Sequence, residues 1–252
     1  MIGLIKALRL PECLLVVALG IISFKYASIP FNILVLITLF FVIASTMLQN
    51  DWRDRFHDIA KSKTFAHEEP ALFLRLLILF WVICCGLIMI LFIQHPSTAS
   101  LLLVMALVGA FYSEARRVPL LSVIIVSLTS ASPLLLPLTF GASFATITNL
   151  FIATVLILFG RETLHDIADM AADKGYKQTV PVIMGDKFAR IVLTIALIIG
   201  CGFVVAVSPF ALIGVAFIVL GLMNVTKDAL VIQVRKRIDI GLVLLVVILL
   251  LA

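Results

Sequence analysis

Nine apolar stretches, separated by short polar connections, run along this chain of 252 residues. A helix needs about 20 apolar residues to cross the roughly 30 Å hydrocarbon core of a bilayer, and the stretches reach or approach that length. They cover residues 10–24, 30–48, 71–93, 98–112, 119–140, 146–160, 188–207, 209–223 and 238–252. A soluble globule is excluded because 63% of the residues are hydrophobic and only 13% are charged. The sequence therefore predicts an all-α integral membrane protein with about nine transmembrane helices.

The distribution of Lys and Arg predicts how these helices are oriented. With nine spans, the N-terminus and the connections after the second, fourth, sixth and eighth spans share one side of the membrane, and that side holds 18 of the 19 basic residues. Only Lys25 lies on the opposite side. The positive-inside rule assigns the basic side to the cytoplasm, which in a prokaryote means insertion into the plasma (inner) membrane. The same bias explains the net charge of +5, so no nucleic-acid partner is expected.

Two acidic motifs with the same internal spacing interrupt this apolar sequence. Six of the fourteen acidic residues lie in them: Asp51, Asp54 and Asp58 in the first, and Asp166, Asp169 and Asp173 in the second. At about 100° of rotation per helical residue, the spacing D-x-x-D-x-x-x-D places three carboxylates within roughly 60° of one helix face. Like charges so close repel one another, and an aspartate in the bilayer core costs about 2.5–3.5 kcal/mol, so a bound divalent cation is expected. Both motifs are on the cytoplasmic side, in the polar connections 49–70 and 161–187 at the ends of the second and sixth spans.

Oxygen ligands dominate both motifs, and this favours magnesium over zinc. His57 and His165 each precede a motif aspartate, which admits a zinc interpretation. Zinc sites favour Cys and His, whereas carboxylates are typical ligands of Mg²⁺. The four cysteines lie in apolar stretches without the paired spacing of metal ligands, so we expect neither a zinc site nor a disulfide framework.

The chain has the pattern of an internal duplication. The two acidic motifs are 115 residues apart, and each follows the second span of a four-span set. Clusters of basic residues after the fourth and eighth spans agree with this repeat. We therefore predict one membrane-embedded domain over residues 1–252, in which two four-helix pseudo-repeats, about 1–117 and 118–237, surround a central cavity and a ninth helix is added.

The fifth span contains Pro133 and Pro137, which predict a kink. A proline inside a helix removes one backbone hydrogen bond and clashes with the preceding turn. Inside a membrane, a backbone freed in this way must face protein or a cavity rather than lipid.

The acidic motifs resemble those of the UbiA superfamily of intramembrane prenyltransferases. Two patterns of that family, N-D-x-x-D-x-x-x-D and D-x-x-D-x-x-x-D, match Asn50, Asp51, Asp54 and Asp58, and then Asp166, Asp169 and Asp173. The sequences around the motifs are similar as well: Arg161-Glu162 before the second motif, Gly175, Thr179-Val180-Pro181 and Gly185 after it, and Tyr112-Ser113 with Arg116-Arg117-Val118-Pro119 after the fourth span. The resemblance extends over the whole topology.

The resemblance implies a site with two Mg²⁺ ions bridged by a diphosphate. In the family pattern one ion is bound by Asn50, Asp54 and Asp58, and the second ion by Asp169 and Asp173. Asp51 and Asp166 are further candidates for the metal ligands. In the family the first aspartate of the second motif tends to face the acceptor, so Asp166 either orients or deprotonates the acceptor or joins the metal shell.

Several side chains near the motifs are candidates for binding the diphosphate oxygens. Among the basic residues, Arg116 is the first candidate and Arg117 the second, and the weaker candidates are Arg53, Lys174 and Lys177. A guanidinium group forms bidentate contacts with phosphate, which favours Arg116 and Arg117. Tyr112 is a catalytic candidate because its hydroxyl can donate a hydrogen bond to the diphosphate. The alternative for each residue is an interfacial charge or aromatic anchor.

The sequence thus predicts a Mg²⁺-dependent enzyme that transfers a prenyl group from a prenyl diphosphate to an acceptor dissolved in or at the bilayer. Aromatic quinone precursors and glycerol phosphates are the acceptor types expected first, and a porphyrin side chain or a specialised metabolite is also compatible with the motifs. A UbiA-type terpene cyclase, with the same fold and metals but no acceptor, is the alternative. A secondary transporter is more remote, because transporters carry ionisable groups near the bilayer midplane and here nearly all charges lie at one membrane face.

Overall fold

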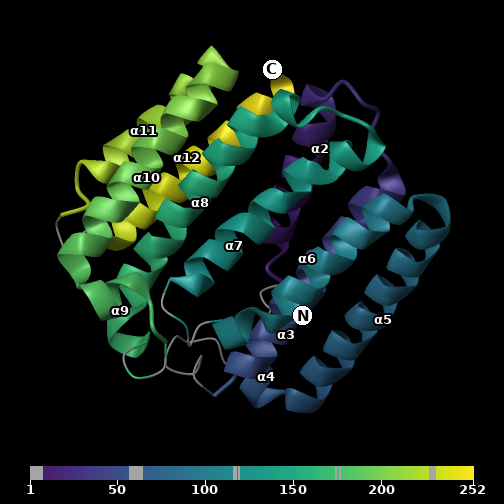
Figure 1. Ribbon diagram of the computed structural model, residues 1–252. Helices are drawn as coiled ribbons and strands as arrows, with labels where there is room; N and C mark the ends of the chain where they lie inside the picture. Colours follow the sequence, from purple (N-terminus) through teal and green to yellow (C-terminus); the bar gives the residue numbers. More distant parts are fainter. Residues whose placement is uncertain are drawn as a thin grey trace. The chain divides into compact units, whose positions relative to one another are not determined.

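The computed structural model describes residues 8–56, 65–115, 118, 120–173, 175, 177–226 and 231–252. Within these residues the regular structure is entirely helical, with eleven α-helices and two 3₁₀ segments (Figure 1). In chain order they are α2 Leu10–Tyr26, α3 Ile33–Asp54, α4 Phe65–Glu68, α5 Pro70–Gln94, α6 Pro96–Ala115, α7 Leu121–Ala131, η2 Ser132–Phe140, α8 Phe144–Asp173, α9 Val180–Met184, α10 Asp186–Val207, η3 Pro209–Ala211, α11 Leu212–Leu222 and α12 Val231–Leu251. The predicted all-α class is confirmed for the described part of the chain.

Five of the described helical segments are long and apolar enough to cross a membrane. They are Ile33–Asp54, Pro70–Gln94, Leu121–Phe140, Phe144–Ala171 and Asp186–Val207. Two shorter apolar segments, Pro96–Tyr112 and Pro209–Leu222, add to them. Many large apolar side chains on these helices are exposed, among them Val82, Met89 and Ile93 on α5, as expected for surfaces that face lipid. The number of nine membrane crossings stays a prediction.

Local sequence explains where several helices begin. The side-chain oxygen of Asn32 accepts a hydrogen bond from the backbone N–H of Leu34 at 2.9 Å and caps α3, a contact typically worth about 1 kcal/mol. Proline is the first residue of both α5 and α6. It is tolerated there because a backbone N–H in the first turn of a helix has no hydrogen-bond acceptor within the helix. Gly185, with φ of 86°, separates α9 from α10 in a conformation that few other residues adopt.

The fifth span changes from an α-helix to a 3₁₀ helix just before the two prolines that predict a kink. The α-helix ends at Ala131, and residues Ser132–Phe140 continue as a 3₁₀ helix with Pro137 inside it. The Thr139 hydroxyl lies 2.7 Å from the Thr98 hydroxyl, and Phe140 packs edge-on against Phe24. The segment after the α-helix is therefore packed against protein, as expected for a span whose backbone ladder is broken.

The chain forms two compact units. The first unit comprises Met1–Ser113 and Leu136–Ala142, and the second comprises Glu114–Leu135 and Ser143–Ala252. In the first unit α3 packs against α2 and α5, around fully buried side chains that include Phe24, Leu39 and Leu102. Because apolar surface gains little by leaving lipid, close van der Waals packing is the main force that holds such helices together.

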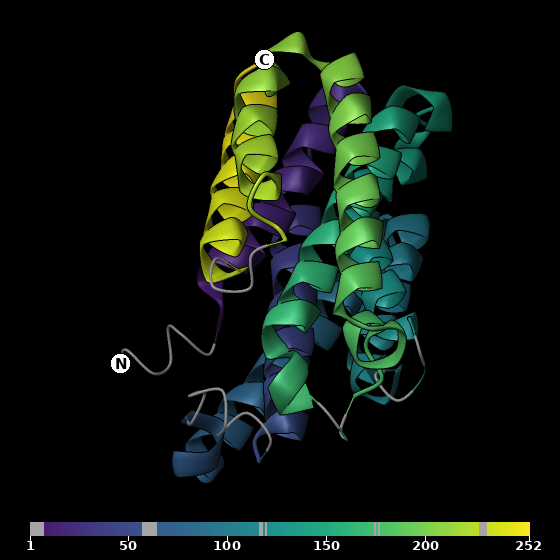
Figure 2. The same cartoon turned by 90° about the vertical axis from the view of Figure 1, so that its left-hand side faces the viewer.

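In the second unit α8 packs against α7, α10 and α12, and α11 packs against α12. Figure 2 shows α11 and α12 side by side, in yellow-green and yellow. Glycines allow these helices to approach closely. A Cβ atom placed on Gly160 of α8 would lie 2.6 Å from the side chain of Leu197, and one on Gly214 of α11 would lie 2.9 Å from the carbonyl oxygen of Gly241 on α12. Both distances are far below normal carbon contacts.

Two glycines of α10 make a matched test of this packing. A Cβ on Gly200 would lie 2.7 Å from Ile157 and 3.1 Å from the backbone oxygen of Ala153, whereas a Cβ on Gly202 would meet no atom within 4 Å. We expect Gly200→Ala to destabilise the protein by about 1–3 kcal/mol through overpacking. Gly202→Ala should instead stabilise it by up to about 1 kcal/mol through helix propensity. Thermal unfolding in detergent micelles measures both, and equal shifts of the same sign would contradict the close α8–α10 contact.

Candidate active site

The first acidic motif lies on the last two turns of α3 (Ile33–Asp54). Asp54 is buried, with 3% of its surface exposed, and Asn50, Asp51 and Arg53 are partly buried. The prediction that the motif is helical and lies at the end of the second span is therefore confirmed for Asp51 and Asp54. The polar connection, expected to begin at residue 49, begins later because the helix continues through Asp54. Asp58, the fourth member of the motif, lies outside the described residues.

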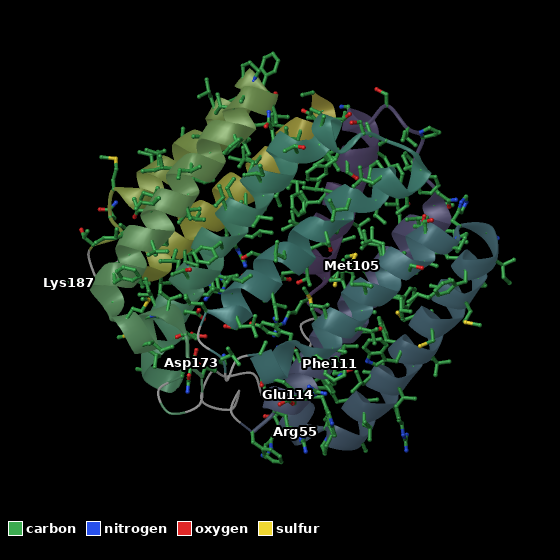
Figure 3. All side chains as sticks on the ribbon, viewed as in Figure 1. Arg55, Met105, Phe111, Glu114, Asp173 and Lys187 are labelled. Atoms are coloured by element: carbon green, nitrogen blue, oxygen red, sulfur yellow. The ribbon has the colours of Figure 1, made fainter. Side chains whose placement is uncertain are left out.

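Three neighbours in the first unit hold these last turns of α3. The side-chain amide of Gln49 donates a hydrogen bond to the backbone oxygen of Ala110 on α6 at 3.2 Å. The Trp52 ring stacks on Phe73 of α5, with centroids 6.1 Å apart. The Arg55 guanidinium lies 4.2 Å from the centre of the Trp52 ring, and Figure 3 shows Arg55 at the lower end of α3. The contacts with Ala110 and Phe73 connect the end of α3 to α6 and α5.

An ion pair that the sequence analysis missed joins Arg9 to Asp51. The Nη2 atom of Arg9 donates to the Asp51 carboxylate across 42 residues of sequence. Arg9 immediately precedes α2, and its φ of 43° lies in the left-handed region that is unfavourable for a residue with a Cβ atom. Such a conformation persists where neighbouring contacts stabilise it, and the ion pair is one such contact. The available sequence signal was a basic residue before the first apolar stretch, which the positive-inside rule already explained.

Tyr112 lies near the C-terminal end of α6 (Pro96–Ala115) and is partly buried. It is two residues beyond Ala110, whose backbone oxygen accepts the hydrogen bond from Gln49. The hydrogen bond therefore links the turn of α6 that bears Tyr112 to the turn of α3 that precedes Asn50. Arg116 and Arg117, the preferred diphosphate ligands, lie outside the described residues.

The second acidic motif lies on the last turns of α8 (Phe144–Asp173), again on the helix rather than in a connection. A helix of 30 residues is about 45 Å long, which exceeds the roughly 30 Å hydrocarbon core, so its last turns can leave the core while the helix continues. Asp166 and Asp169 are partly buried, and Asp173 is 1% exposed. Figure 3 shows Asp173 at the lower end of α8 and Lys187 at the start of α10.

Lys177 returns to the end of the second motif. Its backbone N–H donates to the carbonyl oxygen of Asp173 at 2.9 Å, and its ammonium nitrogen lies 3.3 Å from the Asp173 carboxylate. Gly175, with φ of 85°, allows the chain to turn between them. The structure thus brings together a predicted metal ligand and a predicted diphosphate ligand. Lys174, a further diphosphate candidate, lies outside the described residues.

A network of charged residues joins α8 to α12 one turn before the second motif. The Nε atom of Arg161 donates to the Asp239 carboxylate of α12 at 2.7 Å, and its Nη1 atom donates to Glu162 at 2.7 Å. Arg235 lies 3.9 Å from the other oxygen of Asp239. Arg161 and Glu162 belong to the family pattern recognised in the sequence, whereas Asp239 was not predicted. In the sequence, Asp239 is an acidic residue at the start of the last apolar stretch, directly after a basic cluster.

The described motif residues divide between the two units. Asn50, Asp51, Arg53, Asp54 and Tyr112 belong to the first, and the second aspartate motif with Lys177 belongs to the second. Among the residues that the structure describes, no group of three or more His, Cys, Asp and Glu side chains is arranged to hold a metal ion by itself.

The fold is similar to solved structures of UbiA proteins at low sequence identity. A structure of digeranylgeranylglyceryl phosphate synthase is 19% identical, with 100% of both chains covered and a TM-score of 0.64. The apo structure of a UbiA homologue from Aeropyrum pernix K1 is 15% identical, with 95% of both chains covered and a TM-score of 0.69. A UbiA homologue from Archaeoglobus fulgidus bound to DMAPP and Mg²⁺ is 15% identical, covering 96% of this chain and 98% of that chain, with a TM-score of 0.61.

A comparison with curated protein sequences gives no match. The model of the UbiA prenyltransferase family matches residues 13–250, which is nearly the whole chain. This protein therefore belongs to the UbiA prenyltransferase family and is a prenyltransferase of the membrane.

Proposed function

We propose that this enzyme transfers a prenyl group from a prenyl diphosphate to a lipophilic or amphipathic acceptor of the aromatic quinone-precursor or glycerol-phosphate type. The observation that carries the proposal is the pair of identically spaced carboxylate motifs, each on the last turns of a long apolar helix. UbiA homologues bound to DMAPP and Mg²⁺ and to GPP and Mg²⁺ support the donor class. The similarity to digeranylgeranylglyceryl phosphate synthase supports a glycerol-phosphate acceptor among the two types.

The donor set of the motifs fits Mg²⁺. Carboxylate and amide oxygens are hard ligands, and Mg²⁺ binds through one or two protein carboxylates together with waters and substrate phosphates. The two motifs would therefore each bind one Mg²⁺ ion, and both ions would bind the same diphosphate. Asn50, Asp54 and Asp58 would hold one ion and Asp169 and Asp173 the other, with Asp51 and Asp166 as further ligands. Bound Mg²⁺ would neutralise the charge that develops on the departing diphosphate.

The proposed reaction breaks the bond between the prenyl C1 atom and the diphosphate oxygen. Both bonding electrons leave with the diphosphate, and the allylic cation is then attacked by an electron pair of the acceptor. One proton must leave the acceptor as the new bond forms. Asp166 would orient the acceptor or receive that proton, as the resemblance to the family implies. Tyr112 would donate a hydrogen bond to the diphosphate.

Basic residues would bind the remaining diphosphate oxygens, with Arg116 and Arg117 as the main ligands and Arg53, Lys174 and Lys177 as additional ones. The position of the Lys177 ammonium beside Asp173 supports its place in this group. Since lysine keeps the charge but loses the planar fork, Arg116→Lys should weaken prenyl diphosphate binding by about 1–3 kcal/mol while insertion is normal. Arg235→Lys is the control. Equal, small changes in the binding constant at both positions would leave Arg116 with only a topological role.

The proposed architecture has nine membrane crossings, two four-helix pseudo-repeats around a central cavity, and an active site that faces the cytoplasm. Both motifs then receive a charged substrate from the side of the membrane that holds most basic residues. In a cysteine-free background, single cysteines at Lys61 and Lys177 should be protected from an impermeant thiol reagent in intact cells. Rapid labelling of both positions from outside would reverse the orientation. A cysteine at Lys25 is the control and should react.

The direct test of the function is incubation of the purified enzyme with Mg²⁺ and prenyl diphosphates of several lengths, with and without acceptors. We expect mass spectrometry to detect a prenylated acceptor only when both substrates are present. A cyclic hydrocarbon formed without acceptor would show a UbiA-type terpene cyclase instead. Diphosphate that remains intact under every condition would argue against prenyl transfer altogether.

A further inference from the structure

The acidic face of α8 extends beyond the second motif. Glu162 precedes Asp166 by four residues, Asp169 by seven and Asp173 by eleven. At about 100° per residue these offsets correspond to roughly 40°, −20° and 20°, so all four carboxylates project from one face of the helix. We call these four residues the acidic stripe. Glu162 lies at the end of the stripe that is deeper in the membrane-spanning helix.

A cation of the chain itself lies at each end of the acidic stripe. At one end Lys177 contacts Asp173 at 3.3 Å, within a single turn that follows the helix. At the other end Arg161 contacts Glu162 at 2.7 Å. The two cations are held differently, because Arg161 also donates to Asp239 of α12 at 2.7 Å. One planar guanidinium therefore joins carboxylates of two helices, α8 and α12, which pack together (Figure 1).

The contact with Asp239 fixes the direction in which Arg161 points. A guanidinium group has a rigid fork of donors, and a carboxylate on Nε determines where the remaining donors lie. Without a negative charge at position 239, Arg161 would keep its 2.7 Å contact with Glu162, which belongs to the stripe. Its long side chain would then turn farther along α8 toward Asp166. A cation in that position would compete with a divalent metal for the same oxygens.

We propose that Asp239 is a positioning residue that acts through Arg161. It holds the Arg161 charge at Glu162, so that Glu162 is neutralised by the protein and the positive charge is kept away from Asp166, Asp169 and Asp173. The inference rests on the proposed function, in which the second motif binds metal with the diphosphate. It assigns a role at that site to α12, a helix outside both acidic motifs.

The test is Mn²⁺ binding to purified protein in detergent, with saturating geranyl thiolodiphosphate, in which sulfur replaces the bridging oxygen. Electron paramagnetic resonance of free Mn²⁺ gives the dissociation constant without any turnover. Asp239→Asn should raise this constant by about 3- to 10-fold, because an uncompensated cation moves toward the metal ligands. Arg161→Gln should lower it, because Glu162 then keeps its full negative charge beside the metal ligands and no guanidinium offsets that charge. The double variant should resemble Arg161→Gln rather than Asp239→Asn, because Asp239 is proposed to act through Arg161.

A purely structural role of the ion pair predicts a different pattern. If both single variants raised the dissociation constant, or if Asp239→Asn left it unchanged, the inference would be overturned. Should Asp239→Asn not fold, Arg161→Gln alone decides, because tighter binding supports the inference and weaker binding overturns it. Asp239→Glu keeps the charge and should bind Mn²⁺ like the wild type. Wild-type protein that binds no Mn²⁺ would overturn the proposed function, and the inference with it.

The second unit contains a matched control for the loss of an ion pair. Asp186 of α10 accepts from the Nε atom of Arg190 at 2.8 Å, and its side chain is 30% exposed. Asp239 accepts from Arg161 at 2.7 Å, and its side chain is 34% exposed. Asp186→Asn therefore removes an ion pair of the same chemistry that lies outside the acidic stripe. Its dissociation constant for Mn²⁺ should equal that of the wild type. An increase as large as that of Asp239→Asn would show a general effect of lost ion pairs and overturn the assignment.

Discussion

Asp54→Ala and Asp169→Ala should each lower kcat by two to three orders of magnitude. Both carboxylates are proposed to hold the cations that stabilise the departing diphosphate, and removal of one preorganised electrostatic contact typically costs about 10²–10³ in rate. Asp54 is also buried at the end of α3, so no neighbouring surface carboxylate can replace it easily. The measurement is single-turnover release of diphosphate at saturating prenyl diphosphate and Mg²⁺, which separates the chemical step from binding.

The double variant shows whether the two motifs act as one site. If both hold the same diphosphate, Asp54→Ala with Asp169→Ala should be little slower than either single variant, as for residues that work as a unit. Rate losses that multiply would instead indicate independent roles for the two motifs. Glu69→Ala is the control for removing an acidic residue, because Glu69 is exposed immediately before α5 and lies in neither motif. It should retain the wild-type rate.

Hydropathy located the helices well but not where the motif helices end. The apolar stretch 71–93 corresponds to α5 (Pro70–Gln94), and 188–207 corresponds to α10 (Asp186–Val207). In contrast, the stretches 30–48 and 146–160 stop well before the ends of α3 at Asp54 and α8 at Asp173. An apolar stretch ends where the chain leaves the hydrocarbon core, but the helix can continue beyond that point because its backbone hydrogen bonds do not require apolar side chains. Hydropathy alone therefore assigns the polar last turns of α3 and α8 to the connections that follow.

The two aspartate motifs could be recognised in the sequence because they consist of one residue type at short spacings, and the structure places their described members on the ends of α3 and α8. The metal-binding role of these residues stays a prediction. The ion pairs were not visible. Arg9 and Asp51 are 42 residues apart, and Arg161 and Asp239 are 78 residues apart. A basic residue near a membrane surface is also expected from the positive-inside rule, so its presence gives no indication of a partner.

Removal of divalent metal should abolish prenyl transfer, the largest effect that we expect. The proposed ligands are carboxylate and amide oxygens without thiolates, a donor set that suits a hard divalent cation. Without metal, the diphosphate would meet the negative charge of both motifs with only the basic side chains to offset it. EDTA should therefore stop both product formation and diphosphate release, and added Mg²⁺ or Mn²⁺ should restore them.

The control for this experiment is the fold itself. The helices of both units are held by apolar packing and close glycine contacts that involve no metal, so far-ultraviolet circular dichroism should be the same with and without EDTA. Lost activity with unchanged helicity places the metal in the reaction rather than in the folding of the chain. Full activity in metal-free buffer would contradict the proposed mechanism, because basic side chains alone would then suffice to stabilise the departing diphosphate.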